Sequence, residues 1–390
     1  ISSSRYRYTR RLDKGRSDVY SFTEVKCIMN IVFRTDASQQ IGSGHVMRCL
    51  TLAKELHSNC EKISFITREH KSNLNELIID KGFDLTSMPL QNVLQNNLEN
   101  YEKWLGVTQE IDAEETIKIV KNQKINWLII DHYALDSIWE KKLRFYVENI
   151  MVIDDLANRT HDCDILLDQN LFNNMQERYK DKTPEKCIKL FGPQYAILGS
   201  DYYNFHKKIK ARSLPIENIL IFFSSLDLQN LTSMTLSVLE KIGATFKSIE
   251  VVISKKSPNY IEVLNKVSKL TGANIYSDVP TLATLIKKAD LAIGAGGSTN
   301  WERLCLGLPT IVVTIADNQQ ISNQNLHQKG LIKLIGSADI VGIDDIASAV
   351  KEVIYCNNYD IWSKNCMQVC SGNGTSILSD FILKKHSELL

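Results

Sequence analysis

Neither charge sign is in excess in this sequence. Lys and Arg together number 46 against 45 Asp and Glu, so the formal net charge is +1, and the charges are spread along the chain. Proteins that bind the nucleic-acid backbone or an anionic membrane carry a basic patch or stripe. The composition therefore argues against nucleic-acid and membrane partners and favours a small-molecule ligand.

Long apolar runs and closely paired cysteines are also missing. No segment reaches the ~20 apolar residues of a membrane-spanning helix, and no apolar stretch follows the N-terminus as in a secretory signal. The nine cysteines are scattered, odd in number and without a C-x-x-C pair, which is typical of reduced thiols and argues against a zinc site. We expect a cytoplasmic protein that holds no metal.

The glycine-rich turns of the chain match neither of two common phosphate-binding patterns. They lack the G-x-G-x-x-G spacing of a dinucleotide site, and they lack the Lys and the following hydroxyl of a P-loop. ATP chemistry of the P-loop type is therefore disfavoured. We expect no cofactor.

The sequence does contain an alternation of short apolar runs with amphipathic stretches of helix length. Such an alternation predicts parallel sheets covered on both faces, and 390 residues with 44% hydrophobic content suffice for two domains. The expected strands lie at 31–33, 63–66, 127–130, 151–153 and 165–167, and then at 219–223, 249–253, 291–294 and 310–314. The predicted fold class is α/β, with two doubly wound, Rossmann-like domains that face a central cleft.

The domain limits follow from composition. Residues 1–28 are polar and basic and directly precede Met29, so we expect an N-terminal extension outside the fold, with a targeting segment as the alternative. The N-terminal domain is predicted over 29–205 and the C-terminal domain over 217–375, joined by a Pro-containing linker. Residues 376–390 are predicted to form a C-terminal helix that packs on the first domain. The polar segment 91–101 is expected to be a surface connection.

The first candidate site is a glycine-rich turn between the first strand and a helix. Gly42 and Gly44 allow backbone conformations that are closed to other residues, and helical apolar spacing begins at Val46. His45 then lies at a helix N-terminus, where the dipole favours an anion and a neutral imidazole. We interpret His45 as a candidate general base. The alternative is a polar residue that only caps the helix.

Other polar residues of the first domain are placed around this imidazole. Asp36 is expected to orient the His45 ring as the third group behind the base, with an ion pair to an arginine as the alternative. His132 and Tyr133 follow a strand end and are expected to line the cleft, with a satisfied buried imidazole as the alternative for His132. The acidic pairs near 154 and 164 are expected to fix loops through hydrogen bonds rather than to bind a metal.

The second domain carries another glycine-rich turn, which contains Gly296, Gly297, Ser298 and Thr299. Backbone N–H groups of such a turn can approach a diphosphate without obstruction, and the hydroxyls add donors. Glu302, about one helical turn further on, is a candidate acceptor for a ribose diol. The alternative is an ordinary tight turn followed by an acidic helix N-terminus.

A third polar turn follows the strand expected at 310–314. Asn318 and Gln319 can both donate and accept hydrogen bonds, which suits sugar hydroxyls or acetamido groups. A simple helix N-cap at Asp317 or Asn318 is the alternative, and the two roles are compatible.

Four blocks in this order carry a resemblance to a known family. They are Arg34-x-Asp36-x5-Gly42-x-Gly44-His45-x-x-Arg48, then Ile130-Asp131-His132-Tyr133, then the run 154–170 that begins Asp154-Asp155, and Gly296-Gly297-Ser298-Thr299-x-Trp301-Glu302. From Met29 to about Gly330 the chain resembles the UDP-2,4-diacetamido-2,4,6-trideoxy-β-L-altropyranose hydrolases of pseudaminic acid biosynthesis.

The resemblance implies a GT-B-like nucleotide-sugar fold and metal-independent hydrolysis. Water would break the anomeric C–O bond with inversion and release UDP and the free sugar, which feeds surface glycans such as those of flagellin. The catalytic histidine of the family falls on His45, its nucleotide turn on 296–299 with Glu302, and its polar turn on Asn318 and Gln319. Gly42, Gly44 and Arg48 are expected to contact the substrate. The expected partners are a UDP-sugar and water, bound by a monomer.

Two departures from the family pattern leave alternatives open. Ser224-Ser225-Leu226-Asp227 stands where relatives have Gly-Gly-x-Asp, and Ser225, Asp227 and Asn230 are expected to contact the substrate. The run Ala196-Ile-Leu-Gly199-Ser-Asp201-Tyr202 replaces a family pattern Ala-Leu-Leu-Arg-x-Glu-Phe, so a commonly charged position is missing. A glycosyltransferase of the same architecture, an inactive UDP-sugar-binding protein and a reversible epimerase remain as alternatives.

Overall fold

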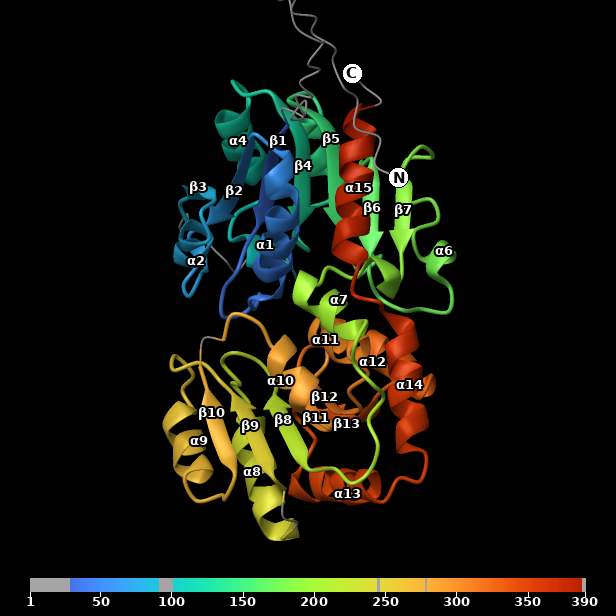
Figure 1. The fold of residues 1–390 in the computed structure, drawn as a ribbon. Coiled ribbons are helices and arrows are strands. Elements are labelled where there is room, and N and C mark those ends of the chain that lie inside the picture. The colour runs from blue at the N-terminus through green and yellow to red at the C-terminus, as the bar shows by residue number, and fades with distance from the viewer. Residues whose placement is uncertain (1–28, 91–100, 244–245, 278, 388–390) are drawn as a thin grey trace, which may run out of the picture.

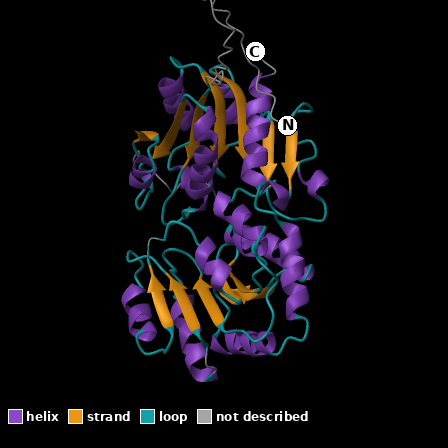
Figure 2. Ribbon diagram, viewed as in Figure 1, coloured by secondary structure: helices purple, strands orange, loops and turns teal. Residues whose placement is uncertain are grey.

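The computed structural model describes residues 29–90, 101–243, 246–277 and 279–387. Two parallel sheets stand end to end, each covered by helices (Figures 1 and 2). The first sheet has the order β3-β2-β1-β4-β5-β6-β7 and the second the order β10-β9-β8-β11-β12-β13. The extension 1–28 and most of the polar segment 91–101 lie outside the described residues.

The strands of the first sheet are β1 (Asn30–Thr35), β2 (Lys62–Arg68), β3 (Asp84–Met88), β4 (Ile125–Asp131), β5 (Val147–Ile153), β6 (Ile165–Asp168) and β7 (Ile188–Phe191). The strands of the second are β8 (Asn218–Phe222), β9 (Ser248–Val252), β10 (Ala273–Tyr276), β11 (Leu291–Ala295), β12 (Thr310–Thr314) and β13 (Lys333–Ser337). All nine strands expected from the apolar runs are present. The predicted α/β fold class is confirmed, whereas β3, β7, β10 and β13 were not expected.

The helices occur along the chain in the following order. Those that follow strands of the first sheet are α1 (Gly44–Leu56), η1 (His57–Asn59), α2 (Asn75–Asp80), α3 (Glu102–Leu105), α4 (Gln109–Val120), α5 (Ser137–Leu143), α6 (Met175–Arg178), η3 (Pro193–Tyr195) and α7 (Ser200–His206). The remainder are α8 (Leu231–Ile242), α9 (Tyr260–Val267), α10 (Ala283–Lys288), α11 (Thr299–Cys305), η4 (Asp317–Gln319), α12 (Gln320–Gln328), α13 (Ile343–Ile354), α14 (Tyr359–Val369) and α15 (Gly374–Ser387). No helix in the described ranges is both long and apolar enough to span a bilayer.

The two faces of the first sheet have separate cores, because successive side chains of a strand point to opposite faces. Phe33 and Trp127 pack with α1 and α15 on one face. Val32 and Leu128 pack with α4 and α5 on the other. This division decides which polar residues at the strand ends reach α1.

The last helix, α15, returns from the second sheet to the first (Figure 1). Its Leu378 and Ile382 are fully buried in the core that α1 covers. At its start the Thr375 hydroxyl donates to the Leu198 carbonyl over 2.6 Å and accepts from the Leu198 N–H over 2.9 Å. The chain therefore crosses between the sheets a second time.

Candidate active site

The polar turns predicted from the sequence meet where the two sheets face each other. The turn before α1 faces the turn before α11, because a Cβ placed on Gly44 would lie 3.9 Å from Ser298 Oγ. Beside it, Asn318 Nδ2 donates to Tyr133 Oη over 3.3 Å. These groups follow β1, β4, β11 and β12, so four strand ends bring them together, which is the usual ligand position in open α/β folds.

The His45 imidazole is held by a carboxylate at the end of β4. Its Nδ1 lies 2.6 Å from Asp131 Oδ1, and the ring packs edge-on against Tyr133 with centroids 4.7 Å apart. Because an ionised carboxylate only accepts, Nδ1 carries the proton and donates. The other ring nitrogen, Nε2, then has a lone pair and can act as a base.

Asp131 also binds Arg48, which lies one helical turn after His45. Arg48 Nε donates to Asp131 Oδ2 over 2.5 Å, and Nη2 donates to Oδ1 over 2.6 Å. Burial opposes the charge on Asp131, but the Arg48 guanidinium and the His45 ring hold its pKa below the usual range. Arg48, which we expected to touch the substrate, therefore supports the carboxylate that orients the base.

The expectation that Asp36 orients His45 is wrong. Asp36 accepts from the Arg68 backbone N–H over 2.6 Å and pairs with Arg34 Nη1 at 2.7 Å, and it is fully buried. Burial opposes its charge, yet Arg34 and the nearby histidines hold its pKa well below the usual range. The alternative of an ion pair with Arg34 is the one that the structure supports.

His132 also lies in the interior rather than on the cleft wall. It is 2% exposed, its Nδ1 accepts from the Ala134 N–H over 3.1 Å, and its Nε2 lies 3.3 Å from Asp36 Oδ2. Burial lowers its pKa, although Asp36 opposes the shift. Its expected contact with the substrate is not supported. It is a buried imidazole, as in the alternative, but its Nε2 has no aligned hydrogen-bond partner among the described residues.

Tyr133 links the two halves of the site. Its hydroxyl donates to Asp155 Oδ1 over 2.5 Å and accepts from Asn318. Burial and the Asp155 charge raise its pKa well above the ordinary value, so it stays a neutral donor. Tyr101 and Trp104 surround its ring with centroids 5.2 and 5.6 Å away. Asp155 was not expected in this role.

The backbone geometry of both turns requires glycine. Gly42 has φ +78 and its N–H donates to the Ser38 carbonyl over 2.9 Å, so it shapes the turn before His45. A Cβ on Gly296 would come within 2.1 Å of Asn323 Nδ2, and Gly297 has φ +110. Asn323, a buried residue of α12 that sequence reasoning missed, therefore fixes the second turn from behind. Ser298 and Thr299 follow at its exposed end and at the start of α11.

Glu302 and Gln319 flank this turn. Glu302 is half-buried and burial raises its pKa to about 7, although the Tyr202 hydroxyl and Arg303 favour its charged form. Gln319 Oε1 accepts from the Ile315 N–H over 3.2 Å, and a Cβ on Gly297 would lie 3.3 Å from Gln319 Nε2. The Gln319 amide N–H groups thus lie next to the turn.

Asp227 and Asn230 have partners within the fold instead of facing a ligand. The Asp227 carboxylate accepts from the N–H groups of Leu231 and Thr232, over 3.1 and 2.8 Å, and so begins α8. Asn230 Nδ2 donates to Glu262 Oε2 over 2.9 Å. Our expectation that these two side chains bind substrate is not supported. Ser225 is exposed on the same loop.

The acidic pairs fix loops through hydrogen bonds, as predicted. Asp154 Oδ2 accepts from the Ala157 N–H over 3.0 Å, and Asp164 Oδ2 accepts from the Ile150 N–H over 2.8 Å. Among the residues that the structure describes, no group of three or more His, Cys, Asp or Glu side chains is arranged to hold a metal ion.

The chain is similar in sequence to several known proteins. Residues 218–358 match the glycosyltransferase family 28 C-terminal domain. The chain is 30% identical over 291 residues to the uncharacterized protein MJ1062 of Methanocaldococcus jannaschii, covering 73% of this chain and 55% of that protein. It is 27% identical over 303 residues to the UDP-2,4-diacetamido-2,4,6-trideoxy-β-L-altropyranose hydrolase of Campylobacter jejuni, covering 77% of this chain and 97% of that protein.

Solved structures show the same architecture at low sequence identity. The Acinetobacter baumannii MurG structure has a TM-score of 0.61 at 14% identity and covers 91% of this chain and 99% of that chain. The calicheamicin glycosyltransferase CalG4 has a TM-score of 0.56 at 10% identity and covers 92% and 98%. The resemblance stated from the sequence blocks and the GT-B-like fold are both confirmed.

Proposed function

We propose that this chain, a GT-B-like protein related to a UDP-sugar hydrolase, hydrolyses UDP-2,4-diacetamido-2,4,6-trideoxy-β-L-altropyranose to UDP and the free sugar. The observation that carries the proposal is the His45 imidazole, held by Asp131 and directly following Gly44, whose added Cβ would lie 3.9 Å from Ser298 Oγ in the glycine-rich turn of the other sheet. We further propose that it acts in the cytoplasm as a monomer and without a metal, and that its product feeds surface glycans.

The proposed reaction needs one base and a site for the leaving group. His45 Nε2 accepts a proton from water while the water oxygen bonds to the anomeric carbon. The bond from that carbon to the β-phosphate oxygen breaks, and its electron pair leaves with UDP. Because water attacks the face opposite UDP, the anomeric centre inverts. Asp131 stabilises the imidazolium that forms, as a carboxylate does behind a catalytic histidine.

The second sheet supplies the nucleotide site in this proposal. UDP is a good leaving group, so the main tasks are to position water and to stabilise the diphosphate. The backbone at 296–299 would receive the diphosphate, and Glu302 would accept hydrogen bonds from the ribose. Asn318 lies beside Tyr133 and Gln319 lies beside the turn, which suits them for the sugar and its acetamido groups.

The decisive experiment follows the reaction of the purified protein by NMR with the UDP-diacetamido sugar and no acceptor. We expect release of UDP and the free sugar, with the inverted anomer appearing first. UDP release that requires an added acceptor would instead indicate a glycosyltransferase, the second candidate, which the match to a glycosyltransferase family 28 domain favours. Recovered UDP-sugar of altered stereochemistry would indicate an epimerase.

A further inference from the structure

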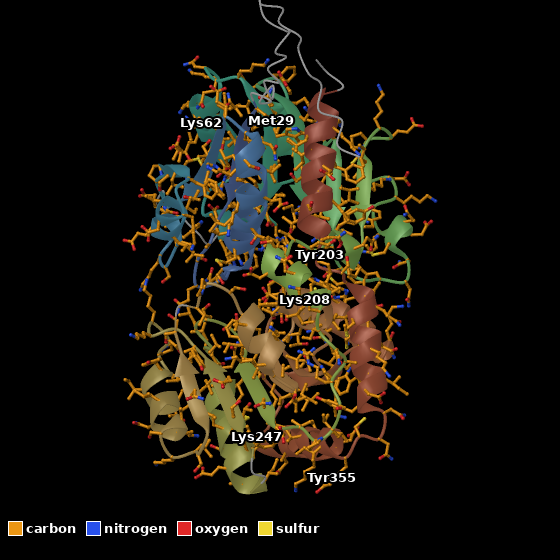
Figure 3. All side chains as sticks on the ribbon, in the orientation of Figure 1. Met29, Lys62, Tyr203, Lys208, Lys247 and Tyr355 are labelled. Atoms are coloured by element: carbon orange, nitrogen blue, oxygen red, sulfur yellow. The ribbon has the colours of Figure 1, made fainter. Side chains whose placement is uncertain are left out.

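A tyrosine from the segment that joins the two sheets stands behind Glu302. Tyr202 lies on α7, is 2% exposed and is buried among residues of α10 and α11. His206 Nδ1, one turn later, lies 2.7 Å from the Cys305 carbonyl and ties α7 to α11. Figure 3 shows this region filled with side chains, with the neighbouring Tyr203 labelled.

The Tyr202 hydroxyl and the Glu302 carboxylate interact without an aligned hydrogen bond between them. Tyr202 Oη and Glu302 Oε2 are both buried, and neither has an aligned hydrogen-bond partner among the described residues. The two groups nevertheless interact: burial and then the Glu302 charge raise the pKa of Tyr202, and the hydroxyl opposes the rise that burial causes in the pKa of Glu302. Buried polar atoms left unpaired are costly, so a small adjustment that aligns them would be favourable.

We propose that Tyr202 is a positioning residue for nucleotide binding: its hydroxyl donates to Glu302 Oε2 and so directs the carboxylate toward the ribose diol. This rests on the proposed function, in which Glu302 receives the ribose.

The other polar groups around Tyr202 and Glu302 are not placed to orient the Glu302 carboxylate. Arg303 follows Glu302 on α11, but its Nη2 donates to the Ala295 carbonyl over 2.6 Å and to Asn300 Oδ1 over 2.7 Å, so it supports the turn. Cys305, also on α11, is a neutral thiol whose pKa is raised by Cys370 and by burial. From α10 and the loop before it, Thr281 reaches Tyr202 rather than Glu302.

The test compares Tyr202→Phe with Tyr203→Phe, a neighbouring tyrosine on α7 that is 37% exposed. Calorimetry would give the affinities for UDP and 2′-deoxy-UDP across pH 5.5–8.5. We expect Tyr202→Phe to weaken UDP binding roughly five- to tenfold, to reduce the preference for UDP over the deoxy analogue, and to move the pH midpoint of binding upward. The midpoint shifts because the carboxylate loses a donor that stabilises its charge. The protonation of UDP itself is the same in every titration, so it does not contribute to a difference in midpoint between variants.

A double-mutant cycle with Glu302→Gln separates positioning from general damage to the fold. If the hydroxyl acts through the carboxylate, Tyr202→Phe has no further effect in the Glu302→Gln protein. Additive losses, or a Tyr202→Phe protein with unchanged affinity and pH midpoint, would overturn the inference while leaving the proposed function intact. A native protein that binds no UDP would overturn the proposed function and, with it, this inference.

Discussion

The proposed hydrolysis depends first on the His45 ring. We expect His45→Ala to lower turnover by about 10²–10⁴-fold, because general-base catalysis contributes that much, and to leave UDP affinity within about threefold of the native value. UDP release and calorimetric UDP binding check the two halves. His57→Ala, an exposed histidine beyond the end of α1, is the matched control. Retained hydrolysis in the His45 variant would contradict the assignment.

Variants of Asp131 and Asp36, which lie at the same sheet edge, should distinguish a role in catalysis from a role in stability. Asp131→Asn should lower kcat by at least about 10²-fold, since the neutral amide neither fixes the Nδ1 proton nor stabilises the imidazolium. Asp36→Asn should instead lower the melting temperature and leave the rate per folded molecule nearly unchanged, because Asp36 pairs with the fully buried Arg34. A larger loss of kcat in the Asp36 variant would contradict this division.

The sequence predicts His45 as the candidate base and the glycine-rich turn before it. It does not predict that Asp131 is the partner of His45. Two aspartates lie at the same sheet edge, because Asp36 directly follows β1 and Asp131 is the last residue of β4, where Thr35 is its register partner. The two carboxylates differ in which face of the sheet they occupy. Asp131 continues the face of Trp127, which α1 covers, whereas Asp36 continues the opposite face. That choice depends on where α1 packs, which no local pattern states.

At the scale of elements, the strands that the sequence failed to predict are those with little continuous apolar surface. β3, β7, β10 and β13 are each the outermost strand of a sheet. β13 is half-buried throughout, and β3 alternates exposed and partly covered residues. A strand that pairs on one side only needs few apolar residues, so its sequence resembles a loop. The central strands, buried on both faces, carry the apolar runs that predicted the fold.

Helix α15 should be needed for the stability of the sheet that it joins. Ile382 is completely buried in the core between α15 and α1. We expect Ile382→Ala to cost about 2–5 kcal/mol of unfolding free energy, since it removes buried methyl groups and leaves a cavity. Urea unfolding measures this loss. Ile361→Ala, at a site 50% exposed on α14, should change stability by less than about 0.5 kcal/mol. Equal effects would contradict the packing.

For the whole molecule, the proposed mechanism uses polar groups and backbone where another enzyme would use a metal. Asp155 is the carboxylate nearest to the Tyr133 hydroxyl, and it already accepts from that hydroxyl and lies 3.7 Å from Arg48. We therefore expect EDTA to leave the hydrolysis rate unchanged after dialysis against metal-free buffer. Activity that falls with EDTA and returns with Mg²⁺ or Mn²⁺ would contradict a metal-independent reaction.

Stability of the whole molecule should depend on pH through buried ion pairs beside the first sheet. His161 Nδ1 lies 2.7 Å from Glu140 and Nε2 lies 3.8 Å from Asp154. Burial alone would lower the pKa of His161, but the two carboxylates raise it to about 9. A raised pKa contributes stability that is complete below the unfolded value of ~6.5 and is lost as pH rises through about 9. The depressed pKa of Asp154 acts oppositely, and its contribution is lost in acid.

These two directions place the stability maximum between about pH 4 and 6.5, the ordinary values for Asp and His. Relative to the native chain, His161→Gln should lose roughly 3 kcal/mol below pH 6.5 through the lost charge, and this part should vanish above pH 9. Unfolding free energies from urea titrations at several pH values measure the difference, with His57→Gln as the exposed control. A deficit that is constant with pH would mean that His161 contributes packing alone. A deficit that grows in alkali would show that the two carboxylates do not hold a charged imidazole.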